Sequence, residues 1–233
     1  MDNILEIKNL TKQYKKTNAG VKNISFVVPK GNFHAFIGEN GAGKTTTIKS
    51  IIGSYFNLKG DILINGVNTK NAEAKKIIGY VPENAIFPSE LTTYDYLKSL
   101  ALLSGINKEK IDLKIDNMLN KFGIIDLKYK QPQSFSSGQK KKVLLIQALI
   151  ANPQLIILDE PAANLDPTAR YELFYTLKQL KNEGKTIFIS SHILSEIDRY
   201  TDSLTLIHKG EILYSGVKYK NLEAIFYEKV IAN

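Results

Sequence analysis

One segment of eight residues constrains the fold of this 233-residue chain more than any other. Residues 38–45 read GENGAGKT and match the pattern G-x-x-x-x-G-K-[ST] in full. An apolar run at residues 33–37 precedes the segment, and a helical pattern follows it. A glycine-rich turn between a strand and a helix lets successive backbone amides surround a phosphate at the positive end of the helix dipole. The segment therefore predicts an α/β fold that binds a nucleotide at this turn.

Two side chains of the turn have predictable tasks. We expect Lys44 to reach the β- and γ-phosphate oxygens and Thr45 to offer its hydroxyl to Mg²⁺. The alternative is a glycine-rich turn without a ligand, and the loop alone is equally typical of a kinase, a GTPase or a motor. The expected nucleotide contacts are nine consecutive residues, Gly38, Glu39, Asn40, Gly41, Ala42, Gly43, Lys44, Thr45 and Thr46.

Composition narrows the class of protein further. Hydrophobic residues make up 43% of the chain and charged residues 23%, a balance typical of a compact globular body. The absence of cysteine excludes disulfides, thiolate metal sites and cysteine catalysis, and it fits a reducing compartment. The net charge of +8 comes from scattered lysines without an aromatic-basic motif, so we interpret it as a solvated surface and expect no nucleic-acid partner.

The sequence offers no sign of a membrane span or a leader. The first ten residues carry an early acid instead of a basic segment followed by an apolar run, so we expect no signal peptide. The longest apolar stretch, residues 143–151, is broken by Gln147 and is far shorter than the ~18 residues of a spanning helix. We therefore expect any role at a membrane to depend on a partner.

Strand and helix patterns alternate along the chain and divide it into four parts. We expect strands at residues 4–7, 24–28, 33–37, 77–81, 155–158 and 186–189, a hairpin at 61–66, a final strand pair turning at 209–210, and helices from just after Gly38 to 52 and from 166 to 184. Strand signals vanish between residues 88 and 151, where apolar residues follow helical spacing. The predicted parts are an antiparallel β region with the first part of the core (1–87), a helical insert (88–151), the rest of the core (152–216) and a short C-terminal helix (217–233).

Two acids follow a buried strand. Asp159 and Glu160 come directly after the apolar run at residues 155–158, at the strand edge where open α/β sheets bind ligands. We expect Asp159 to hold Mg²⁺, directly or through water, and Glu160 to orient or deprotonate the attacking water. A pair of surface acids at a strand end is the plainer interpretation, and the upstream phosphate loop favours the functional one.

A second segment, at residues 135–139, can be interpreted only through its resemblance to a known family. Ser136 can cap a helix that runs to residue 150, and by itself this is an ordinary capped helix. Residues 135–139 (FSSGQ), however, are similar to the LSGGQ signature of ATP-binding cassette (ABC) proteins, and they precede the acidic strand by 20 residues. The resemblance implies contact with the γ-phosphate of an ATP held by an opposite subunit, through Ser136, Ser137, Gly138 and Gln139. The chain would then complete its sites only as a dimer.

Three further positions match the family one by one, and a fourth departs from its pattern. Tyr14 falls where the family has an aromatic residue that stacks on adenine, although a lone tyrosine before a strand usually only packs. Asp166 matches an aspartate at the dimer seam and can also cap the following helix. His192 matches a histidine that contacts the γ-phosphate. Glu83 stands where most of the family has glutamine; a carboxylate can still bind Mg²⁺, and the same replacement occurs in cassettes that resemble drug, peptide and polysaccharide exporters.

The resemblance, which covers residues 14 to about 226, implies both fold and function. The fold would be a P-loop NTPase of the ABC type, with a RecA-like core, an antiparallel β subdomain and an inserted helical subdomain. The function would be hydrolysis of Mg-ATP by a dimer, homomeric or heteromeric, at the cytoplasmic face of a membrane. Its partner would be a separately encoded permease, docked near Glu83 and the helical subdomain, with export as the favoured direction. The rival hypotheses are a soluble ABC ATPase acting on ribosomes, DNA repair or protein assembly, and a regulatory protein that binds ATP without turnover.

Overall fold

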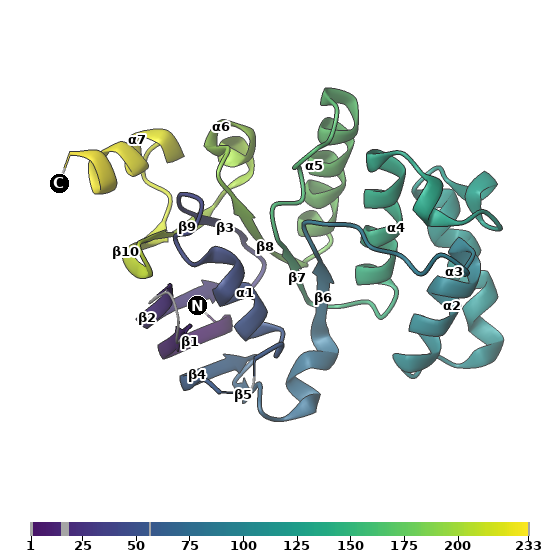
Figure 1. Cartoon of the computed structure of the whole chain (residues 1–233), viewed down its shortest axis with the longest axis horizontal. Helices are drawn as coiled ribbons and strands as arrows, with labels where there is room; N and C mark the ends of the chain where they lie inside the picture. Colours follow the sequence, from purple (N-terminus) through teal and green to yellow (C-terminus); the bar gives the residue numbers. More distant parts are fainter. Residues whose placement is uncertain (1, 15–18, 56, 233) are drawn as a thin grey trace.

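Two β-sheets and a group of helices beside them make up the molecule (Figure 1). The computed structural model describes residues 2–14, 19–55 and 57–232. An antiparallel sheet has the order β2-β1-β4-β5, and a second sheet has the order β10-β9-β3-β8-β7-β6. The strands of the first are β1 (Asn3–Gln13), β2 (Gly20–Pro29), β4 (Lys59–Ile64) and β5 (Val67–Asn68). Those of the second are β3 (Phe33–Ile37), β6 (Ile78–Val81), β7 (Leu155–Leu158), β8 (Thr186–Ser191), β9 (Ser203–His208) and β10 (Glu211–Val217).

The parallel strands of the second sheet are buried on both faces. Every residue of β3, β7 and β8 is buried, as their continuous apolar sequences predict. Phe36 and Phe188 point to the side of the antiparallel sheet and of helix α1 (Lys44–Ile51). Phe33 and Ile187 point to the opposite core, under helices α4 (Ser137–Leu149) and α5 (Pro167–Asn182). Alternate side chains thus fill two cores, one on each face of the sheet.

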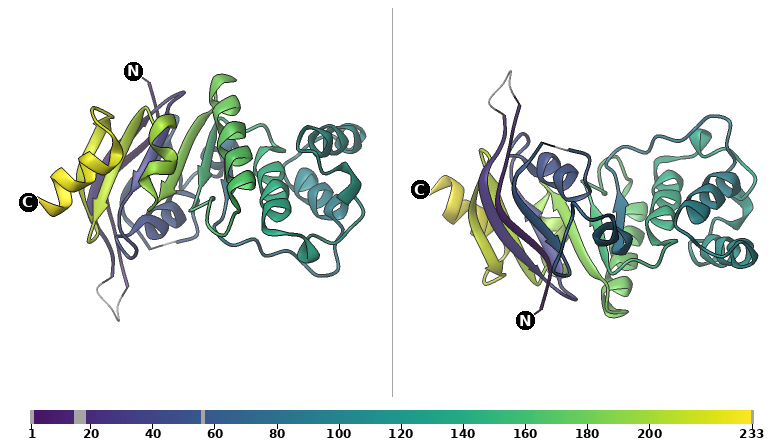
Figure 2. Two further views of the ribbon diagram at one scale, coloured as in Figure 1. Left: turned by 90° about the horizontal axis from the view of Figure 1, so that it is seen from above. Right: turned by 90° about the horizontal axis from the view of Figure 1, so that it is seen from below.

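The helical insert lies at one end of this sheet (Figures 1 and 2). It contains α2 (Thr93–Leu103), α3 (Lys108–Lys121) and α4, joined by two short 3₁₀ turns, Ile125–Leu127 and Pro132–Ser134. Helix α4 also packs on the edge strand β6, where a Cβ added to Gly79 would lie 2.4 Å from the carbonyl oxygen of Ala148. Only glycine permits this close approach. The insert is therefore attached to the core through α4.

The remaining helical segments are short. They are the 3₁₀ turns Ala72–Ile77 and Asp198–Tyr200, helix α6 (Leu194–Ile197), and helix α7 (Leu222–Phe226) continued by the π-helical turn Tyr227–Ile231. Leu222 and Ile225 of α7 are buried, in agreement with the amphipathic pattern of residues 222–230. Within the described ranges, no helix is both long enough and apolar enough to cross a lipid bilayer.

The observed elements match the expected α/β order, with two corrections. Helix α1 begins at Lys44 and not just after Gly38, because residues 38–43 form the phosphate loop. Strand β1 continues to Gln13, beyond the strand expected at residues 4–7 and into the polar segment 11–19, because it pairs with β2 on one side and β4 on the other. Residues 15–18 of that segment lie outside the described residues. The proposed boundaries of the four parts stay predictions.

A histidine lies in the core between the two sheets. His34 of β3 is fully buried, its ring lies nearly parallel to those of Phe26 and Phe188, with centroids 6.4 and 5.7 Å away, and its two ring nitrogens bond the hydroxyls of Ser203 (2.8 Å) and Thr205 (2.9 Å). Burial lowers the pKa of His34 to about 3. The imidazole is therefore neutral in the folded protein at all ordinary pH values.

This buried histidine predicts a loss of stability in mild acid. Between its unfolded pKa of about 6.5 and its folded value, only the unfolded chain takes up the proton, so the free energy of unfolding falls as pH falls. We expect about 2 kcal/mol less stability at pH 5 than at pH 7 from this residue alone. Urea unfolding of the wild type and of His34→Gln at both pH values measures it. An equal pH dependence in the two proteins would contradict it.

Candidate nucleotide-binding site

The carboxyl ends of four parallel strands meet at one edge of the second sheet. Strand β3 leads into the phosphate loop, β7 into Asp159 and Glu160, β8 into His192, and β6 into the segment with Glu83. A cleft of about 330 Å³ opens at this edge. Its lining residues come from five parts of the chain: Tyr14, Ala19, Gly20, Asn40, Gly41, Gly43, Lys44, Thr45, Thr46, Glu83, Glu160, Ala163 and His192.

The phosphate loop depends on glycine at its end. Gly43 is the N-cap of α1, with φ of 111°, and a Cβ added there would lie 2.6 Å from a methyl carbon of Val21. No side chain caps α1, so its first amides are available to an anion. Lys44 is only 6% exposed, and its ammonium donates to the carbonyl oxygens of Gly38 (2.7 Å) and Glu39 (3.2 Å). The loop is therefore shaped as a phosphate cradle with the lysine folded over it.

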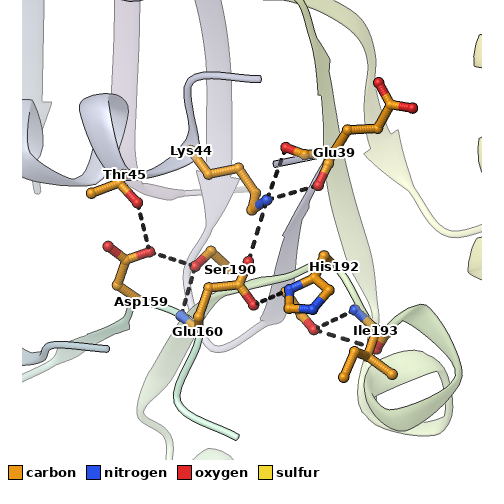
Figure 3. A network of polar contacts seen from close by, with 10 residues as sticks. Glu39, Lys44, Thr45, Asp159, Glu160, Ser190, His192 and Ile193 are labelled. Carbon is orange, nitrogen blue, oxygen red and sulfur yellow. Dashed lines mark hydrogen bonds and ion pairs between the residues drawn. The ribbon is translucent and has the colours of Figure 1, made fainter. Parts of the chain in front are cut away.

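Asp159 is a buried carboxylate next to two residues of the cleft, Thr45 and Glu160, but it is not itself among the described lining residues. It is 2% exposed, and its Oδ1 accepts a hydrogen bond from the Ser190 hydroxyl (2.8 Å) and lies 3.5 Å from the Thr45 hydroxyl (Figure 3). Burial raises the pKa of Asp159, while the hydrogen bonds from Ser190 and Thr45 oppose the rise. A bound cation would relieve this cost of burying a charge.

Glu160 connects the phosphate-loop lysine with the histidine. One of its carboxylate oxygens lies 3.2 Å from the Lys44 ammonium, and the other lies 2.9 Å from Nδ1 of His192 (Figure 3). Its backbone amide donates to the Ser190 hydroxyl at 2.9 Å. Its φ of 43° is unusual for a residue with a side chain, so the strand end holds it in a strained conformation. Such strain is common where a side chain must be aimed at a reacting group.

The donor set suits magnesium bound together with phosphate. In the part of the chain that the structure describes, no cluster of three or more His, Cys, Asp or Glu side chains could hold a metal ion by itself. Mg²⁺ usually takes one or two protein oxygens and completes its shell with water and substrate phosphates. The adjacent Asp159 carboxylate and Thr45 hydroxyl fit that arrangement.

Comparison with known proteins identifies the family. The sequence model described as "ABC transporter" matches residues 21–163, more than half of the chain. The chain belongs to the ABC transporter family. It is 50% identical over 222 residues to a putative ABC transporter ATP-binding protein of Mycoplasma pneumoniae, covering 94% of this chain and 68% of the relative. It is 34% identical to the lantibiotic transport ATP-binding protein SrtF of Streptococcus pyogenes, covering 98% of each.

Solved structures agree. An ATP-binding subunit of an ABC transporter superposes with a TM-score of 0.83 and 34% sequence identity, covering 97% of this chain and 92% of the other. The α/β fold of a P-loop ABC ATPase, expected from the sequence, is thereby confirmed. The protein is the ATP-binding subunit of an ABC transporter and an ATPase.

In this ABC ATPase most of the expected ATP contacts lie together. Tyr14, Glu83, Glu160 and His192 line the same cleft as much of the phosphate loop. Of the loop itself, Gly38, Glu39 and Ala42 are not among the described lining residues; the carbonyls of Gly38 and Glu39 hold the Lys44 ammonium. Ala19 and Gly20 also line the cleft, and no motif in the sequence pointed to them.

The signature-like segment lies away from this cleft, at the start of α4 (Figure 1). Ser136 and Gln139 form a reciprocal cap there: the Gln139 amide donates to the Ser136 hydroxyl (3.3 Å), and the Ser136 amide donates to the Gln139 side chain (3.1 Å). A Cβ added to Gly138 would lie 3.1 Å from that of Ala169 in α5. Asp166, which caps α5 by accepting from the Ala169 amide (2.9 Å), is equally outside the cleft lining. These residues do not contribute to the cleft of their own chain.

A second, larger hollow of about 460 Å³ lies between α3, α4 and α5. It is mostly apolar, and its described lining includes Gly138 and Lys141 but none of the phosphate loop. The smaller cleft carries the phosphate-loop residues together with Glu160 and His192, so it is the candidate nucleotide site.

Two polar residues of the site are not evident from the sequence. Ser190 donates to Asp159 and accepts from the amide of Glu160, but nothing in the sequence distinguishes it from a buried strand serine without a role in the site. Lys141 is 5% exposed, and its ammonium donates to the carbonyl oxygens of Pro82 (3.2 Å) and Glu83 (3.1 Å). Burial lowers the pKa of Lys141 to about 8, although the charges of Glu83 and Asp159 oppose the shift. A run of three lysines gave no sign that the middle one is buried.

The Ser190 contacts predict a measurable structural role. Ser190→Ala leaves the buried Asp159 carboxylate with only the longer 3.5 Å contact to the Thr45 hydroxyl and leaves the Glu160 amide without its acceptor, so we expect the free energy of unfolding to fall by about 1–3 kcal/mol. Chemical denaturation at pH 7 measures it, with the exposed Ser104→Ala as a control that changes stability by less than about 0.5 kcal/mol. A Ser190→Ala protein as stable as the control would show that these bonds add nothing.

Proposed function

We propose that the cleft at the carboxyl edge of the second sheet binds Mg-ATP and hydrolyses it. The observation that carries the proposal is the continuous line of contacts from Lys44 through Glu160 to His192, beside the buried carboxylate of Asp159. A phosphate-binding lysine and a candidate base within one cleft, with a cation-binding carboxylate beside it, form the set of groups that phosphoryl transfer to water requires.

Each group has a proposed task. The phosphate-loop amides and the Lys44 ammonium bind the β- and γ-phosphates, and Thr45 and Asp159 hold Mg²⁺, which supplies neutralisation of the phosphate charge when it is bound. Glu160 orients the attacking water and accepts its proton. His192, bonded to Glu160 through Nδ1, keeps that carboxylate aimed and can donate or accept near the γ-phosphate. Glu83 lines the cleft and is a third candidate ligand of the metal.

Binding requires a change of partners at Lys44. Its ammonium lies 3.2 Å from Glu160, so in contacting phosphate it exchanges a carboxylate for phosphate oxygens. Glu160 then keeps its bond with His192 and is freed to accept from water. The proposed arrangement therefore makes the candidate base available when the phosphates are in place.

A second subunit completes the proposed site. Ser136, Ser137, Gly138 and Gln139 lie at the start of α4, away from the cleft of their own chain, which is the placement expected for groups that contact the ATP of an opposite subunit. The Ser136–Gln139 cap occupies the Gln139 amide, so the amides of Ser137 and Gly138 and the Ser136 hydroxyl are the proposed phosphate donors. Asp166, at the start of α5, is proposed to lie at the same seam.

The subunit is proposed to act with a membrane permease on the cytoplasmic side. ATP would favour the closed dimer and hydrolysis would reopen it, a population shift that a bound permease can use. The Glu83 segment and the helical insert are the proposed docking region. Export is the proposed direction, supported by Glu83 and by the similarity to SrtF, a lantibiotic transport protein. The similarity to transporter subunits does not favour the rival of a soluble ABC ATPase.

Replacement of the phosphate-loop lysine tests the assignment of the cleft. Lys44→Ala removes the ammonium that contacts phosphate, so we expect kcat/KM for ATP to fall at least about 100-fold with an unchanged circular dichroism spectrum. Lys178→Ala, an exposed lysine of α5, is the matched control and should retain wild-type turnover. Undiminished ATPase activity of the Lys44 variant would refute the assignment.

Replacement of the candidate base tests hydrolysis and dimerisation together. Glu160→Gln keeps the shape of the side chain but cannot accept the proton, so we expect turnover to fall by about 100-fold or more and an ATP-bound dimer to accumulate. Light scattering after size exclusion in saturating Mg-ATP measures the mass. The double variant Glu160→Gln with Lys44→Ala should stay monomeric. If the single variant also stays monomeric, even with its membrane partner supplied, the two-subunit site is wrong.

A further inference from the structure

Two tyrosines from distant parts of the chain meet at the rim of the ATP cleft. Tyr14 directly follows β1, and Tyr55 lies shortly after α1. Their hydroxyl oxygens are 2.5 Å apart, and their rings are nearly perpendicular, with centroids 6.2 Å apart and an interplanar angle of 81°. Tyr14 lines the cleft, whereas Tyr55 is not among the described lining residues. Tyr55 therefore contacts the side chain that would meet the base and does not itself face the cleft.

Further contacts hold this pair against the phosphate-binding helix. The Lys12 ammonium lies 4.8 Å from the centroid of the Tyr55 ring and 6.0 Å from that of Tyr14, within the range of a cation–π contact. The Tyr14 hydroxyl also lies 3.5 Å from the Thr46 hydroxyl on α1. The orientation of the Tyr14 ring is thus tied to the helix that follows the phosphate loop.

The physical consequence concerns the cost of binding. Tyr14 is 37% exposed, and an exposed side chain without such contacts loses its rotamer freedom when a ligand stacks on it. A side chain already fixed in the bound orientation does not incur that loss. A Tyr14 side chain that is already fixed therefore increases the affinity for the group that stacks on it. It does not change the affinity for the phosphates, because other residues bind them.

We propose that Tyr55 is a positioning residue of the nucleobase site: through its hydroxyl bond and its perpendicular ring contact it holds Tyr14 in the orientation that stacks on the adenine of ATP. The proposal rests on the proposed function, because it takes the base to lie on Tyr14. On this proposal Tyr55 contributes to the affinity for the base and does not contribute to the affinity for the triphosphate.

The test compares a ligand that has a base with one that has none. Calorimetric titration of the wild type, Tyr55→Phe and Tyr55→Leu with Mg-ATP and with magnesium tripolyphosphate gives both dissociation constants. We expect the Kd for ATP to rise about 3-fold in Tyr55→Phe and about 10-fold in Tyr55→Leu, with the Kd for tripolyphosphate within about 2-fold of wild type. Tyr227→Phe, an exposed tyrosine near the C-terminus, is the matched control and should bind both ligands like the wild type.

A double-variant cycle separates positioning from simple packing. Tyr14→Phe and Tyr55→Phe each break the same hydroxyl bond, so the double variant should bind ATP no more weakly than the weaker single variant. Additive losses would contradict the proposal, as would equal losses for ATP and tripolyphosphate.

Tyr14→Ala distinguishes a failure of the proposed role of Tyr55 from a failure of the proposed base site. If Tyr14→Ala weakens ATP binding but neither Tyr55 variant does, the role of Tyr55 is wrong and the proposed base site stands. If Tyr14→Ala leaves the affinity for ATP unchanged, the base does not lie on Tyr14, and the proposal for Tyr55 falls with the base site.

Discussion

The candidate site depends on the parallel pairing of β3, β8, β7 and β6. Parallel strands end at the same edge of a sheet, so the residues that follow them come together although they are far apart in the sequence. The phosphate loop, the two acids, the histidine and the Glu83 segment each follow one of these strands. A slip of one residue in any of the pairings would turn the side chains before the site to the other face of the sheet. The two apolar cores, one on each face, are what prevent such a slip.

The site also contains two charged side chains that are buried. Asp159 and Lys44 are almost fully buried, and each is accompanied by polar partners rather than left alone. A buried charge lowers the stability of the fold unless hydrogen-bond and ion-pair partners replace its lost hydration, so the surrounding residues must be held in place to supply them. The raised pKa of Asp159 shows that its partners offset only part of the cost. This balance of charges is the one expected of a site that takes up a cation together with a polyphosphate, as proposed here.

Helix α4 connects the signature-like residues with the Glu83 segment. Its first turn carries the signature-like residues, its second turn bonds the Glu83 segment through Lys141, and its last turn packs on β6 at Gly79. A displacement of the Glu83 segment would therefore act on the same rigid element that presents Ser137 and Gly138. The close contact at Gly79 and the two Lys141 hydrogen bonds are the physical links through which the helical insert and the core would move together.

Local patterns in the sequence were enough to establish the α/β class, the phosphate loop, the caps of α4 and α5 and the pair of acids after β7, because each depends on neighbouring residues and on burial of apolar runs. The phosphate-loop motif predicts a turn, but it does not show at which residue the turn ends, so only the structure places the start of α1 at Lys44. Only the tertiary structure showed Ser190 between the two acids, Lys141 under the Glu83 segment and Tyr55 against Tyr14. These contacts join residues that are tens of positions apart, and strand pairing and core packing, rather than local sequence, bring them within bonding distance.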